Sequence, residues 1–558
     1  MAFALSRRQA LAGGVALGGV FAVPVRAAPL ALSTIPMAPF VEARTSAGRV
    51  RGGTARGALV FKGIPYGGPV SGRARFAAPR PVTPWTGVRD ALTLGAPTLQ
   101  KPKSTYGENE PGYSEDCLFL NVWTPALDGK RRPVMFYCHG GGFSTGSAGS
   151  SVQDGGRLAA VYDVVVVASN HRLGLMGYLD LSRFDGHFTA NAGMLDIVAA
   201  LAWTRDNIAE FGGDPGNVTI FGESGGGAKV ATLMAMPAAK GLFHKAGIQS
   251  GAWPRRQPKA AADETARRLM KALDIPAQQA RRLADVPAQT LLDLQLAAEN
   301  GGGPLLAPSD GSPALPASPR LDRAGADAEQ PGQFAPVVDG AVLPRHPFDP
   351  DAPPLSADIP LKIGYNREEA KFMNMNRPET FSLSEDAMQA RLAVEFGDQA
   401  PVILAAYRQA RPGASPSELY FAIATARIMG EDSIVVAGLK AAQSAPVYLY
   451  RYDYASNFPI SGTDATLGAG HATDIGATFF NWDEHGLHGN GPGLEQAAAH
   501  MSALWTSFAR HGAPAADGVP AWPAYDTGDR PTMLIGADCI LAHDPDGVAR
   551  TMWESLPE

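Results

Sequence analysis

The chain has 558 residues, of which 45% are hydrophobic and 18% are charged, and its formal net charge is −6 at pH 7. This is the composition of a globular protein with enough apolar residues for a large core. A small negative charge gives no electrostatic reason to expect nucleic acid or an anionic membrane surface as a partner. The only cysteines are Cys117, Cys138 and Cys539, which excludes a scaffold stapled by several disulfides.

The first 27 residues have the pattern of an export signal. Arg7 and Arg8 precede a weakly apolar Gly/Ala/Val run, and small residues follow near Ala28. The pattern resembles a twin-arginine signal, with Ala10 where such signals often carry Phe. The apolar run is short and diluted by glycine, which disfavours a permanent membrane anchor. We therefore predict a signal peptide over residues 1–27 and a periplasmic or secreted mature chain, with a basic flexible tail as the alternative.

The mature chain begins with residues 45–67, whose alternating polar and apolar positions and glycine-rich turns predict antiparallel strands. Near-continuous apolar runs follow, as in strands that are buried on both faces. These runs are residues 133–138, 163–169, 218–222, 245–251, 360–366 and 446–454. Helical patterns such as 194–211 lie between them, so we predict a large, mostly parallel sheet with helices on both faces.

Residues 300–333 are rich in Gly, Pro, Ala and Ser, which is typical of a surface loop. The stretch could be a domain linker. However, strand-like and helical patterns resume after it without a new amino-terminal unit. We therefore interpret it as an insertion within a single α/β domain that covers residues 28–558.

The stretch 217–236, NVTIFGESGGGAKVATLMAM, is an apolar run that ends in a glycine-rich corner and continues with helix-forming residues. A sharp strand-to-helix turn at this corner would expose the hydroxyl of Ser224 as a nucleophile. The alternative is a glycine-rich turn whose serine caps the helix. A second Gly-x-Ser-x-Gly match surrounds Ser144, but no strand abuts it and no convincing helix follows it. We favour Ser224 as the nucleophile and assign Ser144 to a loop.

Residues 138–143, CHGGGF, directly follow another apolar run. Consecutive glycines allow backbone N–H groups to turn towards one point, because no Cβ restricts their φ and ψ angles. Preorganised donors of this kind stabilise the oxyanion of a tetrahedral acyl-transfer intermediate. A phosphate cradle is the competing interpretation. Neither glycine stretch continues into Gly-Lys-Ser/Thr, which disfavours a nucleotide-binding P-loop.

A serine nucleophile needs a base, and the base needs an acid that orients it. In the order Ser-acid-His, both partners follow Ser224 in the chain. The candidate bases are His471, His485, His488, His500, His511 and His543. His471 lies in the small-residue stretch GAGHATDI, where an imidazole could move freely, and Glu368 and Glu369 at the end of a strand-like run are the candidate acids. His485 and His488, in WDEHGLHGNG, could instead belong to a solvated loop or an opportunistic metal site.

Taken together, these motifs resemble the type-B carboxylesterases, the family of para-nitrobenzyl esterases, animal carboxylesterases and cholinesterases. The resemblance covers almost the whole mature chain, through the motifs at 61–81, 114–125, 138–143, 170–179, 191–196, 211–227, 334–340 and 468–475. It implies an α/β-hydrolase fold and a serine esterase that hydrolyses small-molecule carboxylic esters through an acyl-enzyme. It implies no metal and no organic cofactor.

By motif, the resemblance implies Ser224 as nucleophile, His471 as general base and Glu369 as orienting acid. Family members usually read Asn-x-Asp-Glu-Gly where this chain reads Asn-Arg-Glu-Glu-Ala from Asn366. Alignment on Asn366 gives Glu369 as the acid. The departures from the family pattern leave Glu368 as a competitor.

The oxyanion donors that the resemblance implies are the N–H groups of Gly141, Gly142 and Gly225. The usual residue after the serine is Ala, so Gly225 is a departure from the family. Glu223 matches the family, and a desolvated carboxylate there could tune the histidine or position water, with a structural hydrogen bond as the alternative. Animal relatives pair the cysteine of the EDCL motif with an upstream cysteine, which is missing here, so we expect Cys117 to be a buried free thiol.

Two alternatives to an esterase follow from the same resemblance. One is a cholinesterase-like binding protein that has lost catalysis, and the other is an amidase or carbamate hydrolase on the same scaffold. The complete set of triad candidates and both glycine elements favour the ester hydrolase. We expect the loops around 101–113, 300–333 and 372–381 to shape its substrate pockets.

Overall fold

The computed structural model describes residues 40–101, 111–306 and 331–556. Pro39–Glu558 form one compact unit. The predicted export signal and most of the predicted insertion at 300–333 lie outside the described residues. Within the described ranges, no helix combines the length and apolar character that a bilayer crossing requires.

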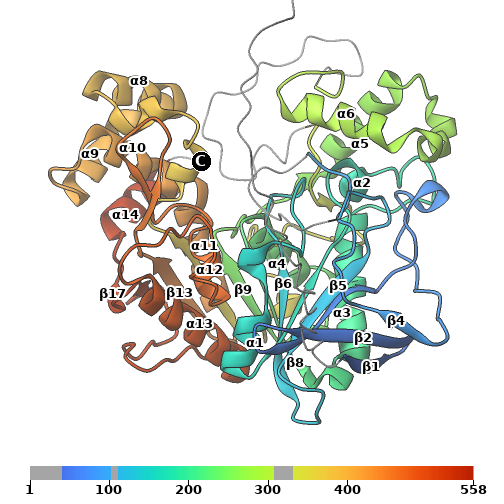
Figure 1. The fold of residues 1–558 in the computed structure, drawn as a ribbon. Coiled ribbons are helices and arrows are strands. Elements are labelled where there is room, and N and C mark those ends of the chain that lie inside the picture. The colour runs from blue at the N-terminus through green and yellow to red at the C-terminus, as the bar shows by residue number, and fades with distance from the viewer. Residues whose placement is uncertain (1–39, 102–110, 307–330, 557–558) are drawn as a thin grey trace, which may run out of the picture. The chain divides into compact units, whose positions relative to one another are not determined.

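A 13-stranded sheet forms the centre of this unit, and two small two-stranded sheets accompany it (Figure 1). Along the large sheet the strand order is β1-β2-β3-β5-β7-β6-β8-β9-β12-β13-β16-β17, and β4 pairs with β2. Its strands are β1 (Val41–Thr45), β2 (Gly48–Ala55), β3 (Ala58–Pro65), β4 (Val88–Asp90), β5 (Phe119–Thr124), β6 (Arg132–Cys138), β7 (Val165–Ser169), β8 (Gly213–Glu223), β9 (Lys245–Gln249), β12 (Leu361–Asn366), β13 (Val447–Tyr452), β16 (Pro531–Ile535) and β17 (Ile540–His543). The small sheets pair β10 (Gln257–Pro258) with β11 (Val337–Val338), and β14 (Ser456–Pro459) with β15 (Thr466–Gly468).

The helices are α1 (Gly156–Tyr162), α2 (Gly174–Tyr178), α3 (Ala192–Asn207), α4 (Gly225–Met234), α5 (Lys259–Ala272), α6 (Ala288–Glu299), α7 (Ala370–Met373), α8 (Glu385–Phe396), α9 (Ala400–Ala410), α10 (Pro416–Thr425), α11 (Glu431–Ala441), α12 (Ile475–Thr478), α13 (Leu494–His511) and α14 (Gly547–Ser555).

The predicted mostly parallel sheet is confirmed. Strands β7, β6, β8, β9, β12, β13 and β16 are parallel neighbours in that order. Each predicted apolar run coincides with one of the first six of these strands. The expected antiparallel strands within residues 45–67 are β2 and β3. The large, mostly parallel sheet with its covering helices is an α/β-hydrolase fold, as predicted.

Strand β6 explains why these runs are apolar without interruption. Val134 and Phe136 belong to one apolar cluster, whereas Met135 and Tyr137 belong to another on the opposite face. Helices α3, α4 and α11 contribute to the first cluster, and α1 and α13 contribute to the second. Because successive side chains of a strand point to opposite faces, a sheet covered on both faces needs apolar residues at every position.

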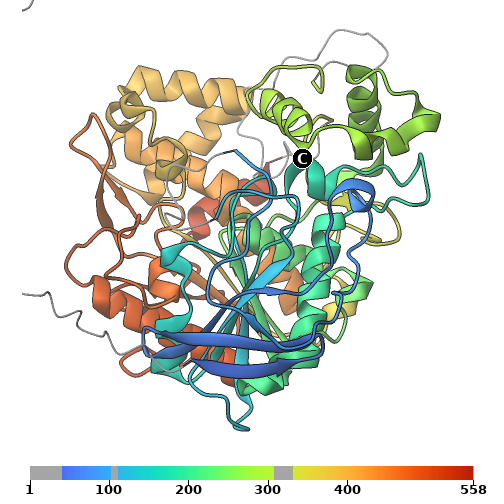
Figure 2. The ribbon, with the colours of Figure 1, turned by 45° about the vertical axis from the view of Figure 1, so that its right-hand side comes forward.

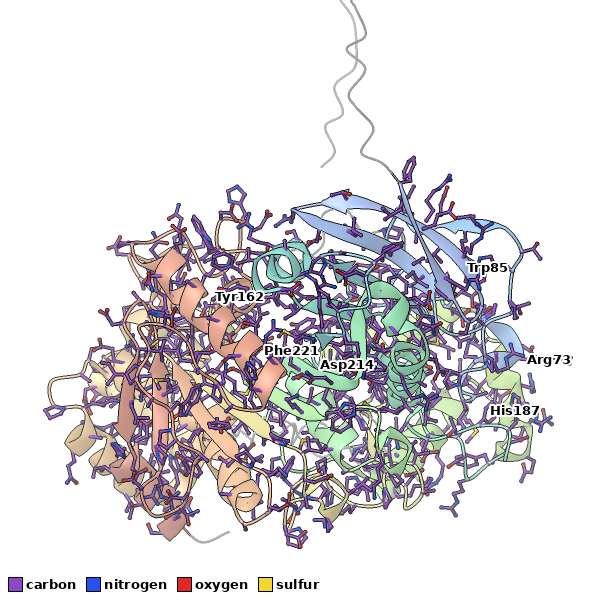
Figure 3. All side chains as sticks on the ribbon, turned by 90° about the horizontal axis from the view of Figure 1, so that it is seen from below. Arg73, Trp85, Tyr162, His187, Asp214 and Phe221 are labelled. Carbon is purple, nitrogen blue, oxygen red and sulfur yellow. The ribbon has the colours of Figure 1, made fainter. Side chains whose placement is uncertain are left out.

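Strand β8 leads from this core towards the candidate nucleophile. Its Phe221, labelled in Figure 3, is fully buried on the α13 side of the sheet. The ring packs against Tyr137, Phe479 and Trp505 at centroid distances of 5.0, 5.6 and 5.7 Å. The strand therefore ends next to Ser224 with its position fixed by aromatic packing.

Two groups of helices, α5–α6 and α8–α10, belong to segments inserted between strands of the sheet. Helices α8, α9, α10 and α14 pack around a third apolar cluster. Figures 1 and 2 both show α5 and α6 (green) as a separate group from α8, α9 and α10 (yellow to orange). Both groups belong to segments inserted between sheet strands, α5 and α6 between β9 and β12, and α8 to α10 between β12 and β13.

The three cysteines are free thiols, and Cys117 and Cys138 are buried. The expectation of a buried free thiol at Cys117 is confirmed. Burial raises the pKa of both buried thiols to about 12. These side chains therefore act as small apolar groups in the core.

A buried ion pair joins two of the sequence motifs. Arg172 donates from Nε and Nη2 to the two carboxylate oxygens of Asp196, at 2.8 and 2.6 Å, and both side chains are at most 2% exposed. Arg172 also donates to the carbonyl of Ala77 at 2.8 Å. A bidentate pair with this geometry compensates the cost of burying two charges, but only while both partners are present.

We predict that Asp196→Asn lowers the free energy of unfolding by about 3–5 kcal/mol, because it leaves a buried guanidinium without its counter-charge. Urea unfolding followed by tryptophan fluorescence measures the change. The matched control is Glu42→Gln, which breaks an exposed pair with Arg49 and should change stability by less than about 1 kcal/mol. Equal effects of the two substitutions would contradict the prediction.

Candidate active site

The candidate residues follow strands whose carboxyl ends lie at one edge of the sheet. Strand β6 leads into the glycine loop, β8 leads to Ser224, and β12 leads to Glu369. These strands belong to one parallel set, in the order β6-β8-β9-β12. In open α/β sheets ligands bind outside the carboxyl ends of the strands, so the topology brings the three segments to a suitable place.

Ser224 occupies the sharp turn that its sequence predicts. Strand β8 ends at Glu223, α4 begins at Gly225, and Ser224 between them has φ 59° and ψ −128°. Its N–H donates to the carbonyl of Gln249 at 2.8 Å, and its own carbonyl accepts from the N–H of Ala228 at 3.1 Å. A strained backbone that the surroundings hold in place is typical of a nucleophile elbow. Its side chain makes no hydrogen bond that caps α4.

Glu369 and His471 meet, although 102 positions separate them in the chain. His471 Nδ1 lies 2.6 Å from Glu369 Oε2, and both residues are buried. The other carboxylate oxygen, Oε1, accepts from Ser250 Oγ and from the N–H of Asn366, each at 2.6 Å. The carboxylate is therefore fixed from several directions and faces the imidazole.

Glu368, the competing acid, has different partners. It forms an ion pair with Lys371 at 2.7 Å and accepts from the N–H of Ala469 at 2.9 Å. Burial opposes its ionisation, but Lys371, the Ala469 N–H and Arg367 together hold the pKa of Glu368 below its usual value. Of the two candidate acids, the structure brings Glu369 to His471.

The other end of the imidazole faces the turn that carries the nucleophile. His471 Nε2 lies 3.2 Å from Glu223 Oε1, and Glu223 directly precedes Ser224. Burial raises the pKa of the Glu223 carboxyl. Burial lowers the pKa of His471, but the carboxylates of Glu223 and Glu369 raise it more, so this pKa stands above its usual value.

We predict that Glu223→Gln moves the acidic limb of the kcat/KM profile to lower pH by about one unit. The base must be neutral to accept a proton, and removal of a nearby carboxylate lowers the pKa of His471. The neutral imidazole then persists to lower pH. Hydrolysis of a p-nitrophenyl ester over a range of pH measures the limb. Glu368→Gln should leave it in place, and a Glu223→Gln limb that does not move would contradict the prediction.

Two further polar residues of the site, Ser250 and Asp474, were not predicted from the sequence. Ser250 donates to Glu369, and Asp474 is a buried carboxylate that accepts from Gln249 Nε2 at 2.6 Å and Asn366 Nδ2 at 3.3 Å. Ser250 stands just beyond the carboxyl end of β9, in the middle of the parallel set. A polar residue at that position of a buried strand was the signal that could have identified it.

The glycine loop has the backbone conformation that its consecutive glycines predict. Gly141 and Gly142 have φ 86° and 62°, in the left-handed region that favours glycine. The carbonyl of Gly141 accepts from the N–H of Thr145 at 3.0 Å. Because the N–H and C=O of a trans peptide point in opposite directions, the N–H of Gly142 points away from Thr145. Among the described residues, neither glycine N–H has a partner.

The loop also explains why residue 225 is Gly, where family members usually carry Ala. A Cβ at this position would lie 2.1 Å from the carbonyl oxygen of Gly142, which is far inside van der Waals contact. The loop and the nucleophile turn therefore touch backbone to backbone. Ser144 lies in a turn beyond the loop, without an adjoining strand or helix, as its sequence predicts.

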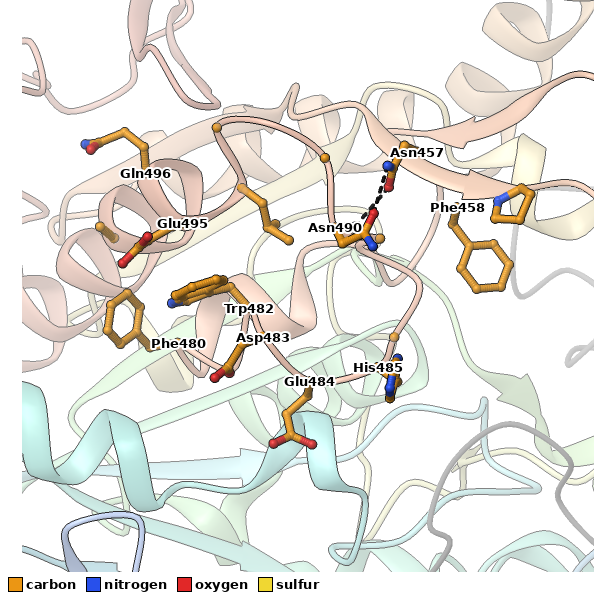
Figure 4. Close-up of a pocket in the computed structure, with 17 residues that line it drawn as sticks. Asn457, Phe458, Phe480, Trp482, Asp483, Glu484, His485, Asn490, Glu495 and Gln496 are labelled. Carbon is orange, nitrogen blue, oxygen red and sulfur yellow. Dashed lines mark hydrogen bonds between the residues drawn. The ribbon is translucent and has the colours of Figure 1, made fainter.

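No hydrogen bond between described residues joins His485 or His488 to a triad candidate. His485 lines a cavity of about 1010 Å³ with Asn457, Trp482 and Asn490 (Figure 4), and none of the triad candidates is among its lining residues. His488 is buried, and its Nε2 lies 2.8 Å from the carbonyl of Glu484. In the part of the chain that the structure describes, no group of three or more His, Cys, Asp or Glu side chains could hold a metal ion.

Comparisons with known proteins identify the family of the chain. A family model described as "Carboxylesterase family" matches residues 38–545. The chain is 34% identical to the para-nitrobenzyl esterase of Bacillus subtilis (strain 168), over 91% of this chain and 97% of the relative. It is 32% identical to the phenmedipham hydrolase of Pseudarthrobacter oxydans, over 88% and 94% of the two chains. A solved carboxylesterase structure of Geobacillus stearothermophilus superimposes with a TM-score of 0.76 at 35% identity, over 92% of this chain and 99% of the other.

Proposed function

This chain belongs to the carboxylesterase family and hydrolyses carboxylic ester bonds, and we propose that it does so through a covalent acyl-enzyme on Ser224. In the first step, Ser224 Oγ attacks the ester carbonyl carbon while His471 Nε2 takes the hydroxyl proton. The electron pair of the carbonyl moves to its oxygen. The N–H groups of Gly141, Gly142 and Gly225 stabilise this oxyanion.

The tetrahedral intermediate then collapses. The bond to the alcohol oxygen breaks, and His471 gives its proton to the leaving alcohol. Water attacks the acyl-enzyme in the same way, with His471 again as the base. The carboxylic acid is released and the hydroxyl of Ser224 is restored.

The 2.6 Å contact between His471 Nδ1 and Glu369 Oε2 carries this proposal. A carboxylate at Nδ1 keeps a proton on that nitrogen, leaves Nε2 available as the base and stabilises the imidazolium that forms. The position of Nε2 beside Glu223, one residue before Ser224, further supports the assignment. No metal or organic cofactor takes part in the proposed mechanism.

We further propose that the substrate is a small ester with an apolar group next to the scissile bond. The ring of Phe372, which is only partly buried, lies 5.6 Å from the His471 ring, measured between centroids. Each methylene that such a surface removes from water contributes about 0.8 kcal/mol. We therefore expect KM to fall from p-nitrophenyl acetate to the hexanoate.

Pre-steady-state hydrolysis of p-nitrophenyl acetate tests the acyl-enzyme. We expect a burst of p-nitrophenol equal to the enzyme concentration, and an acid-quenched protein that is heavier by one acetyl group on the peptide containing Ser224. Hydrolysis without a burst and without any acetylated peptide, at saturating substrate and short times, would point to direct attack by water. That outcome would reject the proposal.

We also propose that residues 1–27 export the enzyme to the periplasm or beyond. The pair Arg7–Arg8, the short apolar run and the small residues near Ala28 support a twin-arginine route. Fractionation of cells that produce the full chain, with amino-terminal sequencing of the product, tests this. We expect a mature start near Ala28, and expect Arg7→Lys with Arg8→Lys to retain the full-length chain in the cytoplasm. Unchanged export of that variant would overturn the proposed route.

A further inference from the structure

Lys229 is a fully buried cation in the helix that begins at the nucleophile. It lies five positions after Ser224 in α4 and is 0% exposed. Its Nζ donates to the carbonyls of His139 at 2.9 Å and Gly142 at 3.0 Å, and lies 5.7 Å from the centroid of the Phe143 ring. A buried lysine is costly unless its donors are satisfied. All of these contacts are with the glycine loop at 139–143.

Every carbonyl in this loop has a partner. Lys229 binds those of His139 and Gly142, and the Gly141 carbonyl accepts from Thr145. The carbonyl of Gly140 lies 2.9 Å from His139 Nδ1, and that of Phe143 accepts from the N–H of Gly174 at 2.7 Å. Because each N–H points opposite to the preceding carbonyl, the bonds to the Gly140 and Gly141 carbonyls orient the N–H groups of Gly141 and Gly142. Lys229 fixes the two peptides on either side of these, those of the His139 and Gly142 carbonyls. Lys229 ties this arrangement to the helix that follows the nucleophile.

The position of Gly225 gives independent support. The Gly142 carbonyl that Lys229 binds is the one that lies 2.1 Å from the place of a Cβ at residue 225. Lys229 thus holds this oxygen against the nucleophile turn, where an alanine side chain would otherwise stand. The lysine and the glycine at position 225 are two parts of one arrangement. Burial lowers the pKa of Lys229 to about 7, but an amine in either protonation state has the two N–H donors that the carbonyls need.

We propose that Lys229 is a positioning residue, whose amine fixes the two peptides that flank those carrying the Gly141 and Gly142 N–H groups, so that these N–H groups stay directed at the oxyanion. Lys229 does not touch the reacting atoms. It acts through the backbone of Gly142 and His139. This inference rests on the proposed acyl-enzyme mechanism and adds to it the element that orders the oxyanion donors. Its loss should therefore slow the chemical step and leave ground-state binding intact.

Steady-state kinetics of Lys229→Met in the full chain test the proposal. Methionine keeps much of the volume and removes the donors. We expect kcat for p-nitrophenyl acetate to fall by about 10- to 100-fold with KM changed less than about 3-fold, because misaligned donors weaken transition-state binding. The matched control is Lys440→Met, which removes another buried lysine that binds two carbonyls, those of Ser356 at 2.7 Å and Ala357 at 3.2 Å, in α11. Lys440→Met should lower thermal stability but leave kcat unchanged.

A double-mutant cycle with Gly225→Ala separates positioning from general destabilisation. Gly225→Ala alone should lower kcat, because its Cβ meets a carbonyl that Lys229 holds in place. In the double variant Lys229→Met/Gly225→Ala, the released carbonyl can move aside. The combined loss of kcat should therefore be smaller than the product of the two single losses.

Four results would overturn the proposal. The first is an unchanged kcat in Lys229→Met, and the second is a loss of kcat no larger than in Lys440→Met. The third is multiplicative losses in the cycle, and the fourth is full activity of Gly225→Ala, which is decisive even if Lys229→Met does not fold. Failure of the acyl-enzyme mechanism is distinguishable, because the unsubstituted protein would then give no burst and no acetylated Ser224.

Discussion

Ser224→Ala is expected to lower kcat for p-nitrophenyl esters by a factor of about 10⁴ or more, because the acyl-enzyme cannot form without the hydroxyl. The residual rate comes from the oxyanion donors and from substrate binding, which the substitution leaves in place. Release of p-nitrophenol by the purified variant and the unsubstituted protein measures the loss of kcat. Labelling with a fluorophosphonate probe should disappear in the same variant.

The chain supplies a matched control for this experiment. Ser144 also lies in a Gly-x-Ser-x-Gly motif, but in a turn outside the strand-to-helix corner. Ser144→Ala should retain turnover within a few-fold of the unsubstituted enzyme and should still be labelled. Retained labelling of Ser224→Ala, or its loss in Ser144→Ala, would show that the nucleophile has been misassigned.

Replacement of Glu368 or Glu369 by glutamine, one at a time, should lower kcat to very different extents. We expect Glu369→Gln to lower kcat by about 10²–10⁴-fold, because the amide cannot stabilise the imidazolium and can hold His471 in the wrong tautomer. Glu368→Gln should change kcat only a few-fold, because its carboxylate faces Lys371 and the N–H of Ala469. Assays of both variants at the same pH provide the comparison, and circular dichroism establishes that both are folded.

A reversed order, with Glu368→Gln the more damaging substitution, would assign the acid to Glu368. Equal losses would mean that the ion pair with Lys371 holds the whole turn in place. In that case neither variant would identify the acid by itself. Only the predicted order supports Glu369.

The parallel sheet could be predicted because burial of its strands requires apolar residues that are consecutive in the chain. A strand such as β7 (Val165–Ser169), buried on both faces, is apolar along nearly its whole length, without the alternation of a strand that has one face in water. The strand-to-helix corner at Ser224 could be predicted for a similar reason, because its glycines are adjacent to the serine in the chain. Both are local signals.

The supporting residues of the site could not be predicted in this way, because their contacts join distant parts of the chain. Ser250 and Glu369 are 119 positions apart, and Lys229 and His139 are 90 positions apart. Neither Ser250 nor Lys229 stands in a motif whose spacing indicates its partner. The sequence also could not decide between Glu368 and Glu369, because the contact with His471 again joins distant parts of the chain. Adjacent residues share their local sequence, and only the fold determines which carboxylate faces the imidazole.

The free cysteines have a consequence for where the enzyme can be made. Cys117 and Cys138 are buried in the core as thiols, and Cys539 is also a free thiol. Closure of this fold therefore needs no oxidant and no disulfide isomerase, and it can be completed where glutathione and thioredoxin keep thiols reduced. The chain can therefore fold fully in a reducing compartment, as the twin-arginine route proposed above requires of its substrates.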